Sequence, residues 1–373
     1  MICSTMGSLV YGILFCTLLF LTSFLGTLCF LTPFMPFVLV NPWFARRVFD
    51  FFQSLWIVYA VALCEIMMGV KVIITGIPPD RLESNLIVMN HRTRLDWMFY
   101  WSYQIRCGSV HNMKISMKEN LKYIPGPGWA MQCAAFIFLQ RKWQTDKLRI
   151  TAALKYYKLV DVKPQILLFP EGTDLTEETL ATSNTFGEKF GYRKYKRVLH
   201  PRTTGFCFLV EEMKKNRILD SVVDITVAYP KNISQAEIDM LYGNFPKEIH
   251  FHVHLTPSSQ LPETSDDLAL WCRKQWEDKE DKLELFYEKK HFPVDDMPND
   301  HGDCDENRNC DETTVKLYMY GALVFWKLFL IITLYGLLFL PYFRVYILIS
   351  MICFYLVGKR HGGLDNVMFL LKE

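Results

Sequence analysis

The chain has 373 residues, of which 51% are hydrophobic and 15% aromatic, and its formal net charge is +2. This length accommodates one large domain or two modest ones, and the apolar content is high for a soluble protein. The near-neutral charge argues against a basic nucleic-acid-binding protein, and the sequence carries no nucleic-acid recognition motif, so we expect no nucleic-acid partner.

The first apolar segment contains no charged residue from Gly7 to Ala45. As one helix it would extend about 58 Å, about twice the hydrocarbon core of a bilayer. Pro33 and Pro36 are therefore expected to end or kink a first membrane span near Leu31. No basic residue precedes the segment, and it is longer than a signal-peptide core, which favours an uncleaved anchor over a cleaved signal peptide.

The next apolar stretch, from Val48 to Val72, is interrupted by Asp50, Gln53 and Glu65. These polar residues favour a re-entrant or interfacial hairpin partner over a second clean span. We therefore predict that residues 1–72 form an N-terminal membrane anchor of one span plus a second apolar hairpin helix.

The C-terminal region contains two apolar stretches, 317–340 and 342–357, separated by Pro341. They predict a membrane hairpin and tail over residues 315–373, as two spans or as one span plus an interfacial helix. The preceding residues 293–314 are acidic and poor in apolar side chains, which is typical of a solvated linker.

Basic residues flank the membrane segments at Arg46, Arg47, Lys316, Lys359 and Arg360. The positive-inside rule places them, and the residues between the two membrane regions, on the cytosolic side. The cysteines form no C-x-x-C pair, which suits reduced thiols in a cytosol-facing protein.

Residues 73–292 alternate short β-rich runs with segments of helical length. This alternation predicts an α/β domain with a mixed, largely parallel sheet flanked by helices. An amphipathic helix is expected over Trp271 to Glu288. The β-rich runs are Leu86 to Met89, Ala135 to Leu139, Ile166 to Phe169, Ile225 to Tyr229 and Ile249 to Leu255.

The most informative motif, Asn90 to Asp96, directly follows the first of these runs. In an ideal helix His91 and Asp96 would be rotated by about 500°, so their side chains meet only if a turn intervenes. An imidazole oriented by a carboxylate keeps one tautomer and accepts a proton from a hydroxyl near neutral pH. Taken alone, the pair is also compatible with a surface histidine near an unrelated aspartate.

Other polar or turn residues follow later runs in the same way, and the carboxyl ends of parallel strands meet at one edge of a sheet. Together with the first motif they form four blocks: Asn90-His91 with Asp96, Phe136-Ile137 to Arg141, Phe169 to Thr173, and Val227 to Pro230. In order and spacing, these four blocks resemble those of the glycerolipid acyltransferases, which acylate lysophosphatidic acid and related lysophospholipids. The resemblance covers about residues 70 to 290 and is strongest to the members that act on lysocardiolipin.

The resemblance implies that His91 is the general base and that Asp96 orients it. The acceptor hydroxyl would attack the thioester of acyl-CoA directly, with no acyl-enzyme, no metal and no cofactor beyond acyl-CoA as a substrate. Arg141 resembles the family's phosphate-contacting arginine, and a guanidinium group matches the geometry of phosphate oxygens. A surface ion-pair arginine is the alternative interpretation.

Glu171, Gly172 and Thr173 resemble the family's contact to the polar head, and a buried pair of Glu171 with Arg141 is the structural alternative. Lys122 lies where the family has lysines near the thioester and the phosphates, so it is a candidate oxyanion or phosphate contact.

Asp174 departs from the phosphatidate-forming members, which usually carry arginine at this position. An aspartate would repel a doubly charged phosphomonoester, so we expect an acceptor with a singly charged phosphodiester. Lysocardiolipin is the first expectation, and lysophosphatidylinositol and lysophosphatidylglycerol also qualify. A 1-acylglycerol-3-phosphate acyltransferase that makes phosphatidic acid is the alternative. The resemblance also implies residence in the endoplasmic reticulum membrane.

Three further possibilities compete with this assignment. A lipid esterase would need a serine nucleophile, but the chain has no G-x-S-x-G elbow. A non-catalytic membrane scaffold would not need the intact pair of His91 and Asp96.

A zinc site would use His250, His252 and His254, which alternate along one strand, although an exposed strand face explains them without a metal. The basic run over residues 189–197 is either a phosphate-binding or a solvated patch.

Overall fold

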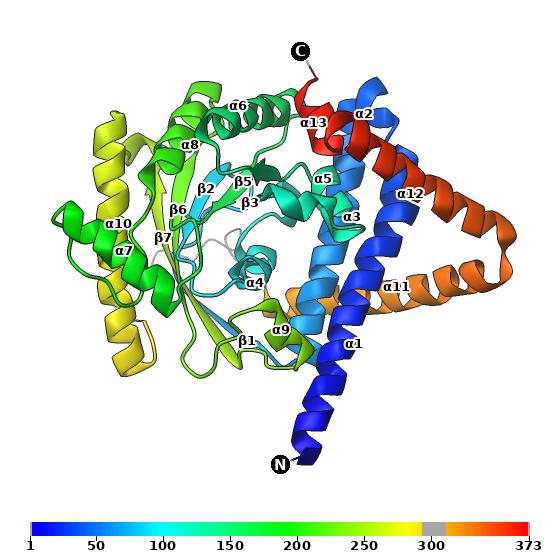
Figure 1. Ribbon diagram of the computed structural model, residues 1–373, viewed down its shortest axis with the longest axis horizontal. Helices are drawn as coiled ribbons and strands as arrows, with labels where there is room; N and C mark the ends of the chain where they lie inside the picture. The colour runs from blue at the N-terminus through cyan, green and yellow to red at the C-terminus, as the bar shows by residue number, and fades with distance from the viewer. Residues whose placement is uncertain (1, 293–310, 372–373) are drawn as a thin grey trace. The chain divides into compact units, whose positions relative to one another are not determined.

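The computed structural model describes residues 2–292 and 311–371, which fall into two compact units (Figure 1). The sheet unit comprises the described parts of residues 1–12, 68–109 and 164–310, and the helical unit comprises those of 13–67, 110–163 and 311–373. These units differ from the predicted division, because residues 110–163 group with the apolar helices and not with the rest of 73–292. The predicted linker over 293–314 lies almost wholly outside the described residues.

The sheet unit contains strands in the order β1-β7-β6-β2-β5. Neighbouring strands are parallel except for β6 and β7, which are antiparallel. The prediction of a mixed, largely parallel sheet flanked by helices is therefore confirmed. The strands are β1 (Lys71–Gly76), β2 (Asn85–Met89), β5 (Gln165–Leu168), β6 (Ser221–Ala228) and β7 (Glu248–Pro257).

Helices cover both faces of this sheet, and the alternation of side chains along β7 shows which helix covers which face. The ring of Phe251 lies 6.1 Å from that of Tyr103 on α4, whereas the next residue toward the N-terminus, His250, contacts Phe286 on α10 at 5.0 Å. Helices α8 and α10 pack against each other, with Phe206 stacked on Trp271. The helices of this unit are α4 (Asp96–Cys107), α7 (Glu177–Lys189), α8 (Thr203–Asn216), α9 (Glu237–Leu241) and α10 (Ser265–Lys289).

Each β-rich run of the sequence overlaps a strand, and the amphipathic helix predicted over 271–288 is part of α10. The sequence pattern did not predict β1, whose first residues belong to the second apolar stretch, or β3 (Met113–Lys118). The interpretation of the histidines of β7 as an exposed face is wrong. His250 and His252 do not lie on an exposed face, because α10 and Phe292 cover that face and leave them 4% and 3% exposed.

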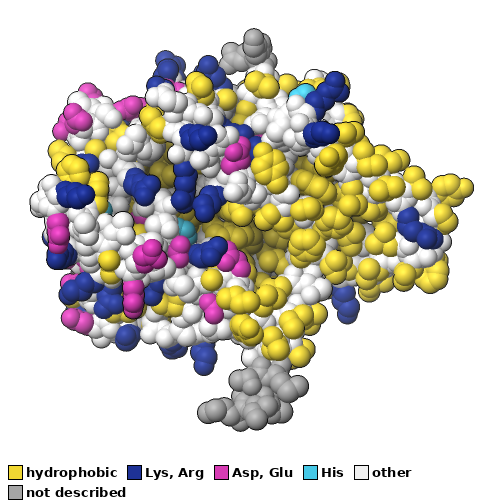
Figure 2. Space-filling model, in the orientation of Figure 1, with side chains coloured by type: hydrophobic (Ala, Val, Ile, Leu, Met, Phe, Trp, Pro, Cys, Tyr) yellow, Lys and Arg dark blue, Asp and Glu magenta, His cyan; other side chains and the backbone are white. Residues whose placement is uncertain are grey.

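The helical unit holds most of the apolar length of the chain. Among residues 2–292 and 311–371, four helical segments are long and apolar enough to cross a membrane, namely Gly7–Phe34, Pro42–Met67, Glu312–Phe339 and Pro341–His361. The regular part of α1 (Ile2–Gly26) gives way to a π-helical turn and a 3-10 turn over Thr27–Phe34, as the prolines predict. Apolar side chains cover most of the visible surface of α11 (Glu312–Phe339) and α12 (Pro341–His361) (Figure 2). The membrane hairpin over residues 315–373 stays a prediction.

The first half of α3 (Pro42–Ala62) carries buried charges. Asp50 accepts a hydrogen bond from the Arg46 guanidinium at 2.8 Å and another from the Lys114 ammonium at 3.0 Å, and all three side chains are buried in the helical unit. Arg46 is therefore a neutralised interior residue, and its charge does not report on which side of a membrane this helix begins.

The remaining elements of the helical unit are short. They are a parallel pair of strands, β3 and β4, and helices α2, α5, α6 and α13, of which α6 packs against β4. Their bounds are α2 (Phe37–Val40), β3 (Met113–Lys118), α5 (Pro127–Cys133), β4 (Ile137–Leu139), α6 (Trp143–Leu159) and α13 (Leu364–Phe369).

Candidate active site

The loop between β2 and α4 is anchored to the neighbouring strand by Asn90. Its side-chain amide donates to the carbonyl oxygen of Val227 at 3.1 Å and its oxygen accepts from the Val227 amide at 2.8 Å. This reciprocal pair satisfies the backbone of β6 beyond the last paired residue of β2 and fixes where the loop leaves the sheet. The chain then turns and α4 begins at Asp96.

The turn brings His91 and Asp96 together, with 3.0 Å between Nδ1 and Oδ2. The Asp96 carboxylate is fully buried and accepts further hydrogen bonds from the Thr93 amide at 2.8 Å and from the Tyr229 hydroxyl at 2.5 Å. These donors, together with the N-terminus of α4, stabilise an ionised carboxylate that would otherwise be costly to bury. The His91 side chain is 16% exposed, so its ring can reach a ligand.

The charges around His91 are those expected for a general base. Burial lowers the pKa of His91, but the hydrogen bond and charge of Asp96, with smaller effects of Glu171 and Asp174, outweigh it and raise this pKa above its ordinary value. With Nδ1 donating to Asp96, the unshared pair of Nε2 is left to accept a proton from a substrate hydroxyl.

Glu171, just after β5, ties three segments of the sheet unit together. Its Oε1 accepts from the His91 amide at 3.3 Å and from Trp276 Nε1 at 3.1 Å, while Oε2 accepts from the Leu199 amide at 3.2 Å. Burial raises the pKa of Glu171 to about 7 in spite of these donors. Glu171 therefore helps to position the loop between β2 and α4, which we call the catalytic loop. Trp276 on α10 is a partner of Glu171 that no sequence motif indicated.

The turn after Glu171 also supports the base. Gly172 has a φ of +74°, a conformation that favours glycine, and its amide donates to the carbonyl oxygen of Phe169 at 3.0 Å. The Phe169 ring stacks on the His91 imidazole with 4.2 Å between centroids. Thr173 is half-buried, and Asp174 accepts from the Gln235 side chain at 3.0 Å.

The sheet unit thus assembles six predicted site residues at the carboxyl ends of the adjacent parallel strands β2 and β5: His91, Asp96, Glu171, Gly172, Thr173 and Asp174. Tyr229, which follows the third parallel strand β6, is a hydrogen-bond partner of Asp96 that the sequence indicates only as part of a motif. Its position directly before Pro230, at the end of a strand, was the available signal.

Lys122 and Arg141 belong to the helical unit. Arg141 follows β4, is exposed and has a φ of +63°. The Lys122 ammonium is buried, 3.3 Å from Glu119 and 3.5 Å from Asp365. Arg149 joins the same cluster through Glu119 at 2.9 Å. The roles of Lys122 and Arg141 as substrate contacts stay predictions.

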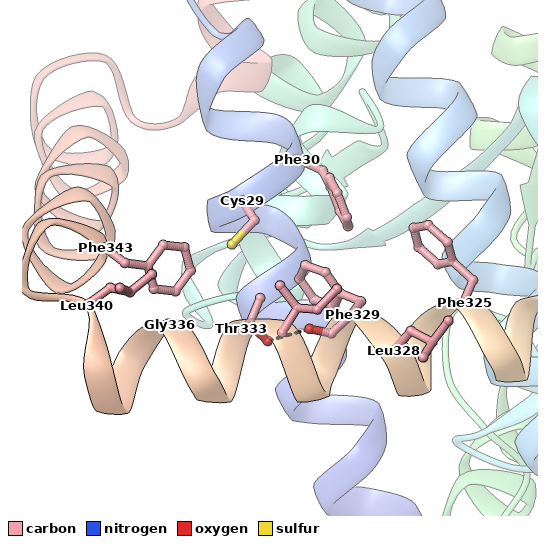
Figure 3. A pocket seen from close by; sticks show the side chains of 10 residues that line it. Cys29, Phe30, Phe325, Leu328, Phe329, Thr333, Gly336, Leu340 and Phe343 are labelled. Carbon is pink, nitrogen blue, oxygen red and sulfur yellow. Dashed lines mark hydrogen bonds between the residues drawn. The ribbon is translucent and has the colours of Figure 1, made fainter.

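An apolar cavity of about 560 Å³ opens among α11, the start of α12 and the π-helical turn after α1, all within the helical unit (Figure 3). The hydroxyl of its one threonine, Thr333, already donates to the Phe329 carbonyl at 2.8 Å. The cavity therefore offers hydrocarbon-like surroundings and no group for acid–base chemistry. Its lining is Cys29, Phe30, Phe325, Leu328, Phe329, Ile332, Thr333, Gly336, Leu340 and Phe343.

No group of three or more potential metal ligands occurs within residues 2–292 and 311–371. The two buried histidines of β7 have other partners, since His250 contacts Glu248 at 2.7 Å and His252 contacts Thr75 at 3.0 Å. The zinc alternative therefore finds no support in the described geometry of these imidazoles.

Comparisons with known proteins identify the family of the chain. Residues 74–230 match the model of the family described as Acyltransferase, and residues 239–319 match that described as Acyltransferase C-terminus. The chain is 50% identical to lysocardiolipin acyltransferase 1 of Gallus gallus, over 74% of this chain and 73% of that protein. It is 38% identical to lysophosphatidylinositol acyltransferase 10 of Caenorhabditis elegans, over 88% of this chain and 85% of that protein.

Among solved structures, the 1-acyl-sn-glycerophosphate acyltransferase PlsC of Thermotoga maritima matches 70% of this chain and 96% of its own, with 16% identity and a TM-score of 0.42. On the sequence relationships, the chain belongs to the acyltransferase family and is an enzyme. The resemblance to lysocardiolipin acyltransferases drawn from the motifs is confirmed.

Proposed function

We propose that the protein is a membrane-bound acyl-CoA:lysophospholipid O-acyltransferase that remodels phospholipids, with lysocardiolipin as the main acceptor and lysophosphatidylinositol and lysophosphatidylglycerol as further acceptors. The carrying observation is the part-exposed His91 imidazole bound to a buried, fully hydrogen-bonded Asp96. Family membership and the apolar helices support a lipid substrate and a membrane setting.

In the proposed reaction, Nε2 of His91 takes the proton of the lysolipid hydroxyl as its oxygen attacks the carbonyl carbon of the thioester. The imidazolium that forms is stabilised by the Asp96 carboxylate. The tetrahedral intermediate then collapses, the C–S bond breaks, and the leaving CoA thiolate takes the proton from Nε2. The products are the acylated phospholipid and free CoA, and no acyl-enzyme is required because a thiolate leaves readily.

The direct test offers labelled acyl-CoA and lysocardiolipin to the purified full-length protein in detergent micelles. We expect transfer of the label to the lysolipid with release of one CoA thiol for each acyl group transferred. Release of free fatty acid from a phospholipid without CoA would support the lipid esterase instead. Binding of neither substrate would support the scaffold.

Asp174 supports acceptors that carry a phosphodiester. Gln235 orients the Asp174 carboxylate through a hydrogen bond. The charge of Asp174 contributes to the raised pKa of His91, so Asp174 places negative charge beside the catalytic loop. A phosphomonoester approaching this charge is repelled more strongly than a phosphodiester.

The matching experiment compares lysocardiolipin, lysophosphatidylglycerol and lysophosphatidic acid as acceptors for the wild type, Asp174→Arg and the neutral control Asp174→Asn. We expect the wild type to prefer phosphodiester acceptors, the arginine variant to gain on lysophosphatidic acid, and the asparagine variant to lie between them. Fastest wild-type transfer to lysophosphatidic acid would establish the alternative, phosphatidic acid synthesis.

The proposal also places the protein in the endoplasmic reticulum membrane as a multi-pass protein, with residues 73–292 facing the cytosol. The apolar helices support the membrane setting, and a cytosolic face gives direct access to acyl-CoA. Protease treatment of sealed microsomes should cleave an epitope inserted in the 293–310 segment. Protection of that epitope until detergent is added would place the domain in the lumen.

A further inference from the structure

Arg202 lies against the turn that supports the catalytic base. It directly precedes α8, and its amide donates to the carbonyl oxygen of Pro170 at 2.8 Å. A Cβ added to Gly172 would lie 3.4 Å from both Cδ and Nε of Arg202, so the arginine side chain runs over this glycine. Gly172 belongs to the same turn as Phe169, whose ring stacks on the His91 imidazole. The Arg202 side chain therefore lies beside the turn that supports the base.

The Arg202 guanidinium is exposed and has no hydrogen-bond or ion-pair partner among the described residues. The arginines of the catalytic loop are already engaged. Arg92 donates to Gln235 at 3.0 Å and Arg94 pairs with Glu237 at 3.3 Å. Arg202 is therefore a cation beside the catalytic loop whose charge is left for a ligand.

The nearby basic run is less suited to this task, because its charges are largely matched within the sheet unit. Arg193 pairs with Asp281, Lys194 with Glu188 and Lys196 with Glu284, and Arg197 lies over the ring of Tyr287. A phosphate binding there would have to displace carboxylates, whereas at Arg202 it would not.

We infer that Arg202 binds the phosphate of the acceptor lysophospholipid and so determines the specificity of the reaction for phosphate-bearing acceptors. This inference rests on the proposed function. The guanidinium presents parallel N–H donors that match two phosphate oxygens. Glycine at position 172 leaves room for the arginine to lie along the turn, which holds the bound phosphate near His91 and presents the glycerol hydroxyl to Nε2.

The test uses full-length Arg202→Gln, with Arg217→Gln as a matched control that removes an exposed arginine at the other end of the same helix. Transfer is measured with lysophosphatidylglycerol and acyl-CoA varied separately, and with a monoacylglycerol that has the same chain and no phosphate. We expect Arg202→Gln to raise the KM for lysophosphatidylglycerol by about tenfold to a hundredfold. The KM for acyl-CoA and the rate with monoacylglycerol should stay at wild-type values, and Arg202→Lys should restore part of the loss.

Three results would overturn the inference: an unchanged KM for lysophosphatidylglycerol, a rise in the KM for acyl-CoA alone, which would assign Arg202 to a CoA phosphate, or an equal loss with monoacylglycerol. Binding of labelled lysophosphatidylglycerol in flow dialysis without acyl-CoA gives a readout that needs no transfer. A wild type that transfers no acyl group would contradict the proposed function, and the binding ratio of the wild type to Arg202→Gln would still decide the role of Arg202.

Discussion

Two carboxylates with 0% exposure, Asp96 in the sheet unit and Asp365 in the helical unit, are stabilised in different ways. Asp96 is held by the neutral donors Thr93 and Tyr229 and by one titratable partner whose ring is part-exposed. Asp365 lies near two basic side chains, Lys122 and Arg149, in a cluster that also includes Glu119.

Burial of a charge therefore does not by itself mark a catalytic site. In the helical unit the charges cancel one another, and burial raises the pKa of Asp365 although its cationic neighbours oppose this. In the sheet unit the carboxylate is satisfied by donors that stay in place, while its histidine can gain and lose a proton. We therefore expect the cluster around Asp96 to be catalytic and the cluster around Asp365 to be structural.

The largest effect should come from His91→Ala, which removes the proposed base. We expect kcat to fall by at least about two orders of magnitude, because general base catalysis contributes about 10² to 10⁴. His254→Ala, at an exposed position of β7, is the control and should retain activity. Acyl transfer at the wild-type rate by a folded His91→Ala protein would remove the dyad from the mechanism.

Asp96→Asn should lower kcat by about two orders of magnitude and also change its pH dependence. The base must be neutral to act, so activity falls as the pH drops through the His91 pKa. Since that pKa is raised in the wild type, chiefly by Asp96 acting against burial, the acidic limb should lie above the ordinary histidine value. Loss of the carboxylate should move the limb to lower pH, and a limb that does not move would show that Asp96 acts only through packing.

Lys122→Met tests the other cluster. Removing this ammonium leaves Glu119 and Asp365 with less positive charge, so we expect unfolding to become easier by about 3 to 5 kcal/mol, as for other broken buried pairs. Thermal unfolding followed by circular dichroism measures this loss. If Lys122 instead contacts substrate, as the sequence predicts, Lys122→Met would raise the KM and leave the unfolding midpoint unchanged.

Tyr229→Phe should have the smallest effect, because it removes one of several donors to Asp96. We expect kcat to fall about tenfold, in line with one hydrogen bond to a charged group. With less donation the carboxylate attracts the imidazolium more strongly, so the acidic limb should shift to higher pH, opposite to Asp96→Asn. A shift in the same direction for both variants would contradict the assigned role of the hydroxyl.

Much of the site was predictable because it is encoded locally. Asn90 to Asp96 and Phe169 to Thr173 each follow a short apolar run, and residues after neighbouring parallel strands meet at one edge. Trp276 was not predictable, because it reaches Glu171 across 105 positions of sequence from the middle of a helix whose spacing only indicates a buried face. The contact of Lys122 with Asp365 was not predictable for the same reason, since the two residues are 243 positions apart.

Hydrophobic periodicity and turn residues act over short stretches of chain, so the amino-acid sequence was enough to predict the fold class, the apolar helical segments and the pair of His91 and Asp96. The polar groups around that pair depend on tertiary contacts. Tyr229 and Trp276 donate to buried carboxylates from distant elements, Asp174 is oriented by Gln235, and Arg202 lies over Gly172 with no ion-pair partner among the described residues. Such contacts depend on how strands and helices pack, and no local pattern of residues records that packing.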